Sequence, residues 1–165
     1  MEKIYRIDRD KEGGCLKSIF QLATQVVAEK SALPRDGDPF VTLANDARKR
    51  IREIAPRELA KLRRSPVIID VREKDEFIQG HISGARNVSR GVLEREVKNL
   101  VPDPLSPILL YCSCGSRSAL AADNLQKIGY QNVYSLKGGL FAWLEAGGVV
   151  ESRRTLGSSR EDWEG

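Results

Sequence analysis

The sequence predicts an α/β fold in which helices cover both faces of a mostly parallel sheet. Three short apolar runs, residues 66–71, 107–111 and 133–136, have the composition of buried strands. Segments with helical spacing of apolar residues lie between them. Because strands that alternate with helices form parallel sheets covered on both sides, we expect three layers.

The other elements of this layout follow from local signals. Pro56 is placed to begin a short helix that runs to about Arg64. Residues 74–79 form a short helix that Gly80 closes in a left-handed cap, and 93–100 form another. Residues 85–88 form a brief strand. A helix opens at Ser116 or Arg117 and ends at Gly129, whereas residues 40–54 fit a helix whose end could also begin a strand.

The 165 residues suffice for one hydrophobic core but not for two ordinary domains. We expect a helical extension over residues 1–40, the sheet domain over 41–150 and a polar, mobile tail over 151–165.

A net charge of +4 with both signs interspersed favours an ordinary solvated surface over nucleic-acid binding. No apolar window is long enough for a membrane span, and the N-terminus lacks the apolar stretch of a secretory signal, so we expect a cytoplasmic protein.

The small numbers of cysteine and histidine residues limit which disulfide or metal sites the chain can form. Three cysteines, Cys15, Cys112 and Cys114, are too few for a disulfide scaffold and indicate free or reactive thiols. A single histidine, His81, leaves a Cys-x-Cys pair without a convincing fourth metal ligand. We therefore expect neither a metal nor another cofactor.

The main candidate site follows the second buried run. Cys112 stands where that strand ends, the edge at which α/β sheets bind ligands. The small residues after it allow a tight loop whose N–H groups turn inward as an anion-binding nest, and the helix that follows adds its positive end. Such surroundings lower a thiol pKa, which predicts an ionised nucleophile at Cys112. The alternative is a buried structural cysteine. The candidate binding residues are Ser113, Cys114, Gly115, Ser116, Arg117 and Ser118.

Three ordered motifs resemble the rhodanese (sulfurtransferase) family. The loop reads Cys-x-x-Gly-x-Arg-Ser from Cys112 to Ser118. Residues 69–73, with Glu76-Phe77 and the Gly-His-Ile turn at His81, are similar to the family's first signature. Residues 129–143 are similar to its closing segment. The resemblance spans about residues 51–147 and implies a rhodanese-like domain.

The resemblance implies a two-step sulfur transfer. The Cys112 thiolate takes the outer sulfur of a small anionic donor such as thiosulfate, and a nucleophilic acceptor, cyanide or a thiol, small or on a protein, removes it. Arg117 is expected to hold the loop and the anion, and Arg72 and Arg90 to guide the donor. Asp70 and His81 are expected to be structural.

Two other functions stay open. Related phosphatases and arsenate reductases have five residues between their cysteine and arginine, whereas four separate Cys112 from Arg117, which favours a single sulfur atom over a tetrahedral oxyanion. Domains of this fold also serve as non-catalytic interaction modules, in which the loop cysteine is usually replaced. Cys114 is either a bystander or a second thiol that attacks the persulfide or forms a disulfide with Cys112.

An apolar stripe in the extension needs a partner surface. Its members fall on one helix face: Leu16, Ile19, Phe20, Ala23, Val26 and Val27. We expect this extra N-terminal helix to pack on the sheet domain. A homodimer contact, or a docking site for a sulfur donor or acceptor, is the alternative.

Overall fold

A computed structural model describes residues 37–152 of the chain. Within that range, five parallel strands form a central sheet in the order β1–β6–β5–β2–β4. The strands are β1 (Arg52–Ile54), β2 (Val67–Asp70), β4 (Arg86–Asn87), β5 (Ile108–Tyr111) and β6 (Val133–Leu136). All four residues of β5, the middle strand, are buried, as expected for a parallel strand covered on both faces.

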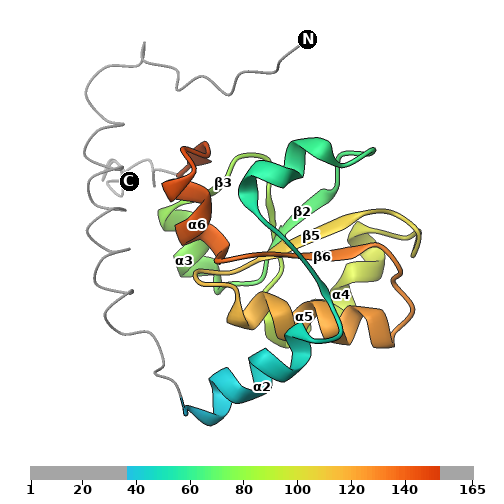
Figure 1. Cartoon of the computed structure of the whole chain (residues 1–165). Helices are drawn as coiled ribbons and strands as arrows, with labels where there is room; N and C mark the ends of the chain where they lie inside the picture. Colours follow the sequence, from blue (N-terminus) through green and yellow to red (C-terminus); the bar gives the residue numbers. More distant parts are fainter. Residues whose placement is uncertain (1–36, 153–165) are drawn as a thin grey trace, which may run out of the picture.

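Helices cover the sheet on both sides (Figure 1). One face carries α4 (Leu93–Leu100) and α5 (Ser116–Lys127), with α2 (Pro39–Arg48) packed on the outside of α5. The other face carries α6 (Gly139–Glu145), α3 (Lys74–Gln79) and the 3-10 turn η1 (Pro56–Lys61). A second turn, η2 (Arg90–Val92), leads into α4. The strands β3 (His81–Ile82) and β7 (Val150–Glu151) pair antiparallel in a small separate sheet.

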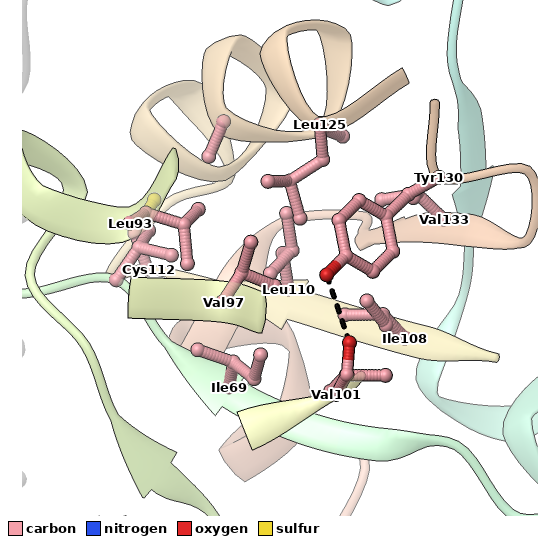
Figure 2. Packing of buried hydrophobic residues seen from close by; sticks show 13 residues of the cluster. Ile69, Leu93, Val97, Val101, Ile108, Leu110, Cys112, Leu125, Tyr130 and Val133 are labelled. Atoms are coloured by element: carbon pink, nitrogen blue, oxygen red, sulfur yellow. Dashed lines mark hydrogen bonds between the residues drawn. The ribbon is translucent and has the colours of Figure 1, made fainter. Parts of the chain in front are cut away.

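The alternation of β5 divides the core into two clusters. Ile108 and Leu110 face α4 and α5, whereas Leu109 and Tyr111 face α6. Figure 2 shows the first cluster, in which the Tyr130 hydroxyl donates a hydrogen bond of 2.8 Å to the Val101 carbonyl. Cys112 belongs to the same cluster, beside Leu93. Cys112 therefore lies inside the hydrophobic core.

The predicted layout is confirmed for the sheet and its covering helices, with the bounds of 74–79, 93–100 and 133–136 as expected. Three details were wrong. Gly80 has a φ of 172°, which is extended backbone rather than a left-handed cap. The segment after Pro56 is a 3-10 turn that ends at Lys61. Glu151, assigned to the tail, pairs with His81 in β7.

Other predictions lie outside the described residues. The helix expected near residues 15–30, Cys15 and the remainder of the tail belong to segments 1–36 and 153–165. In the part of the chain that the structure describes, none of the helices has both the length and the apolar character to cross a membrane.

An ion-pair cluster joins α5 to the segment after α2. The buried Asp123 carboxylate accepts two hydrogen bonds of 3.0 Å from Arg50 and one of 2.7 Å from Lys127. These hydrogen bonds outweigh the effect of burial and lower the pKa of Asp123 to about 2. Folding therefore favours the ionised form of this carboxyl group.

We predict that Asp123→Asn reduces the free energy of unfolding at neutral pH. Because the folded pKa is below the unfolded value of about 3.9, the contribution is present above that value and is lost as the pH falls towards 2. Urea unfolding at several pH values measures it: the difference between wild type and variant should shrink from pH ~5 to pH ~2. Asp75→Asn, at an exposed position of α3, is the control. An equal effect of both variants would contradict the prediction.

Candidate active site

The candidate site is the loop between β5 and α5. Cys112 follows β5 directly, and α5 begins at Ser116. Gly115 lies between them with a φ of +93°, in the left-handed region that favours glycine. A Cβ atom there would lie 3.2 Å from the Gly138 amide nitrogen. The tight turn predicted from the small residues is therefore present.

The N-terminus of α6 holds the loop carbonyls. The Leu140 N–H donates to the Cys112 carbonyl at 2.8 Å, and the Phe141 N–H donates to the Ser113 carbonyl at 3.1 Å. These amides are available because the first N–H groups of a helix have no partner within it. The approach is so close that a Cβ atom on Gly139 would collide with both carbonyls.

The Cys112 sulfur faces loop amides from a buried position. The Gly115 N–H donates to Sγ at 3.1 Å, and the Ser118 amide favours the thiolate as well. Cys112 is nevertheless 0% exposed, and burial, together with the neighbouring Cys114 thiol, raises its pKa well above the ordinary value. The prediction that the loop lowers the pKa of Cys112 is therefore wrong, because desolvation outweighs the amides.

The acidic thiol of the loop is Cys114. It is partly exposed, and a hydrogen bond from the Cys112 thiol is the main cause that lowers its pKa to about 5. The Ser116 Oγ lies 3.8 Å from its sulfur, and the Arg117 charge adds to the effect. Of the two loop thiols, Cys114 is therefore the one whose surroundings favour the ionised form.

Arg117 is anchored by a carboxylate that the sequence analysis did not select. Its guanidinium donates to both oxygens of Glu76, at 2.7 and 2.8 Å, and to Ser113 Oγ at 3.0 Å. Burial opposes ionisation of Glu76, but the hydrogen bonds and charge of Arg117 outweigh it and lower the Glu76 pKa. Arg117 thus holds the loop through Ser113. A sequence signal existed in the spacing of Glu73 and Glu76, which form a capping box at α3.

A second unselected residue reaches the loop from α2. Arg48 donates to Ser116 Oγ at 3.3 Å and to Glu53 at 3.3 Å. Nothing in the local sequence around Arg48 marks it, because its partner Ser116 lies 68 positions away.

The structure corrects the role expected for Arg72. Its buried guanidinium donates to both Asp70 oxygens and, at 2.7 Å, to the Gly80 carbonyl, and it lies 5.9 Å from the centre of the Tyr111 ring. These groups occupy it inside the fold, so it does not guide a donor. Asp70 ties down this arginine and the Arg72 backbone N–H.

The remaining site residues expected from the sequence are Ser118, His81 and Arg90, and each lies in a different part of the fold. The Ser118 hydroxyl is fully buried and bonds to the Gly115 carbonyl and the Ser135 hydroxyl, so it is not free to bind a substrate. His81 stacks on Phe77 and contacts Glu151, which links α3 to β7. Arg90 follows β4 and donates its backbone N–H to Val71 at 3.1 Å; its buried Nε has no hydrogen-bond partner among residues 37–152.

Residues 37–152 contain no group of three or more His, Cys, Asp or Glu side chains placed to hold a metal ion. The loop itself brings together two thiols, main-chain amides and an anchored arginine.

Comparison with known proteins identifies this arrangement. The family model described as "Rhodanese-like domain" matches residues 55–146, more than half of the chain. The chain belongs to the rhodanese-like family. Its matched range contains β2 to α6, including Glu76 and the whole Cys112 loop, but not α2 or Arg48.

Several relatives of this rhodanese-like chain are similar over the same region. YqhL of Bacillus subtilis is 40% identical over 91 residues, which cover 55% of this chain and 68% of that protein. The thiosulfate sulfurtransferase GlpE of Coxiella burnetii is 36% identical over 95 residues, covering 58% and 86%. Among the relatives, the named activity is therefore sulfur transfer.

Solved structures support the fold. A Rhodopseudomonas palustris protein described as a possible tyrosine phosphatase has a TM-score of 0.62 at 29% identity, covering 72% of this chain and 99% of that one. The polysulfide-sulfur transferase of Wolinella succinogenes has a TM-score of 0.58 at 26% identity, covering 76% and 99%.

We predict that Gly139→Ala destabilises the rhodanese-like domain and distorts the loop. The left-handed backbone alone costs an alanine about 1–3 kcal/mol, and its methyl group would push into the Cys112 and Ser113 carbonyls. Thermal unfolding measures the loss. Gly91→Ala is the control, because a Cβ there meets nothing within 4 Å. Equal melting temperatures for the two variants would contradict the role given to Gly139.

We also predict that iodoacetamide alkylates Cys114 faster than Cys112. The Cys114 thiol is partly exposed and has a pKa of about 5, so its rate should be nearly constant above pH ~6 and fall in more acidic solution. Peptide mass spectrometry over a pH series separates the two cysteines. Faster labelling of Cys112 would show that the loop thiolate is on the other sulfur.

Proposed function

We propose that this rhodanese-like protein is a sulfurtransferase that carries a sulfane sulfur as a persulfide on Cys112. The observation that carries the proposal is the Gly115 N–H directed at Cys112 Sγ at 3.1 Å. A main-chain donor so placed stabilises negative charge on this sulfur without rearrangement of the site. The relatives named as thiosulfate sulfurtransferases support the same reaction class.

The first step transfers sulfur from the donor to Cys112. Its thiol gives its proton to the neighbouring Cys114 thiolate, and the Cys112 sulfur attacks the outer sulfur of thiosulfate. The new bond joins the two sulfurs, the sulfur–sulfur bond of thiosulfate breaks, and sulfite leaves with the electron pair.

The second step transfers the sulfur to an acceptor. A nucleophile, cyanide or a thiolate, attacks the outer sulfur of the persulfide. The bond between the two sulfurs breaks, and its electron pair returns to Cys112. The amides that face Cys112 stabilise the thiolate that leaves.

The charges around the loop favour an anionic donor. Arg117 and the N-terminus of α5 both place positive charge beside the two thiols. Because Cys112 is 0% exposed, the donor must present a small outer sulfur while its remainder stays outside. Thiosulfate and polysulfide have this form.

The loop length favours sulfur over phosphate. Four residues separate Cys112 from Arg117, and Arg117 donates to Glu76 and Ser113 instead of pointing unpaired into the loop. A phosphoryl group held inside the loop needs a wider ring and an arginine free to bind its oxygens, whereas only the outer sulfur of the proposed donor enters the loop. A cysteine-dependent phosphatase or arsenate reductase is therefore the weaker alternative.

Intact-mass spectrometry after incubation with thiosulfate tests the proposal. We expect the Cys114→Ser variant to gain the mass of one sulfur atom, because no second loop thiol competes for it, and Cys112→Ser to gain none. Removal of the added mass by cyanide, with formation of thiocyanate, completes the cycle. If no variant that retains Cys112 acquires sulfur from thiosulfate or polysulfide, the domain is a non-catalytic interaction module.

A further inference from the structure

We propose that Glu76 is a positioning residue that makes linear sulfur chains, such as inorganic polysulfide, better donors than thiosulfate. Glu76 acts through Arg117, whose guanidinium it occupies, so that this group is not available to the sulfonate oxygens that thiosulfate carries and polysulfide lacks. The inference rests on the proposed function, because it names the class of donor from which Cys112 takes its sulfur.

The Arg117 guanidinium has no free edge for an oxyanion. Its Nη1 atom donates to one oxygen of Glu76 at 2.7 Å, and its Nη2 atom donates to the other at 2.8 Å and to Ser113 Oγ at 3.0 Å. Both hydrogens of Nη2 are therefore used. Paired binding of a sulfonate needs two neighbouring donors, and each such pair on a guanidinium includes this nitrogen. Arg117 thus cannot hold Glu76, Ser113 and a sulfonate in this way at once.

Glu76 is itself fixed from two sides. It accepts the Glu73 N–H at 3.1 Å, which caps α3, and the Ser113 hydroxyl donates to it at 3.3 Å. The side chains of Glu76 and Arg117 are only 24% and 31% exposed, so water weakens their attraction less than that of a pair on the open surface. A donor that recruited Arg117 would have to break two charge-assisted hydrogen bonds.

Arg72 does not take the place of Arg117. It is 4% exposed, and its guanidinium donates to Asp70 and to the Gly80 carbonyl, each at 2.7 Å. A sulfonate at the loop would therefore meet one arginine that is already paired, while this second one is enclosed in the fold.

The two donors differ in what stays outside the loop. In both, a terminal sulfur must reach Cys112, which is 0% exposed. Thiosulfate leaves three oxygens outside, and these strong acceptors lose water on binding and need new donors. Polysulfide leaves a chain of sulfur atoms, which are weak acceptors and need no arginine. The pairing of Arg117 therefore favours polysulfide.

The loading step balances with polysulfide as the donor. The deprotonated Cys112 sulfur attacks the terminal sulfur of the chain. The new bond joins Cys112 Sγ to that sulfur, and the bond between the terminal sulfur and its neighbour breaks. A polysulfide one atom shorter leaves with the electron pair, and the persulfide keeps the charge of the transferred sulfur.

The test compares the rates at which Cys112 gains sulfur from thiosulfate and from tetrasulfide, each over a series of concentrations. Intact mass measures the gain, and the Cys112→Ser variant reports the reaction at other positions, which is subtracted. In the wild-type chain we expect the second-order rate constant for thiosulfate to be about tenfold lower than that for tetrasulfide, or lower still. Equal rate constants would overturn the proposal, whatever the variants do.

Glu76→Gln is the decisive variant. Glutamine still provides the acceptor that caps α3, but it gives up the charge and one of the two oxygens that hold Arg117. We expect the thiosulfate rate constant to rise about tenfold and the tetrasulfide rate constant to stay within about twofold. Asp75→Asn removes the same charge from an exposed position of α3 and should change neither.

Sulfate gives a second measurement, because it has the oxygens of the sulfonate but no sulfur to transfer. At constant ionic strength, we expect it to slow the loading of Glu76→Gln by tetrasulfide at concentrations that leave the wild-type rate unchanged. Equal inhibition of the two proteins would mean that another cation, such as Arg90, binds the oxyanion, and would contradict the role given to Glu76.

The outcomes separate this inference from the proposed function. If Glu76→Gln melts at the wild-type temperature but loads more slowly from both donors, Glu76 only supports the loop and does not select the donor. That result leaves sulfur transfer intact, because the wild-type chain still loads Cys112. If the wild-type chain gains sulfur at Cys112 from neither donor, the proposed function itself fails.

Discussion

The site depends on two hydrogen bonds from the start of α6 to the Cys112 loop. The Leu140 and Phe141 N–H groups take up the Cys112 and Ser113 carbonyls. With those carbonyls turned towards α6, the amide of Gly115 faces the Cys112 sulfur instead. A peptide segment of this length cannot hold such an arrangement alone, because each residue costs about 1–2 kcal/mol of conformational entropy to fix. The helix N-terminus supplies donors that would otherwise lack partners.

A second constraint fixes the loop from the opposite direction. Glu76 in α3 holds the Arg117 guanidinium with both of its oxygens, and Arg117 in turn holds the Ser113 hydroxyl. Such paired, charge-assisted hydrogen bonds are among the strongest and the most directional in proteins. The loop is thus anchored through its main chain by α6 and through its side chains by α3, which leaves the sulfur atoms as its reactive part.

The different burial of the two thiols gives them different acidities. Cys112 lies in the core cluster of α4 and α5, and the loss of hydration opposes its ionisation. Cys114 is partly exposed, and its polar surroundings lower its pKa to about 5, which favours the ionised form of this thiol. In the proposed sulfur transfer, the buried thiol holds the sulfane sulfur away from water and the acidic thiol exchanges protons with it.

The sequence by itself determined the layers, the strand at the end of which the reactive loop lies, and the loop residues, because buried parallel strands and small-residue turns are local patterns. It could not determine that Arg72 turns inward to Asp70 or that Glu76 meets Arg117 across 41 positions. Nor could it assign the thiolate to Cys114. Those outcomes depend on which groups lose water and which partners they meet, and only the packed tertiary structure decides both.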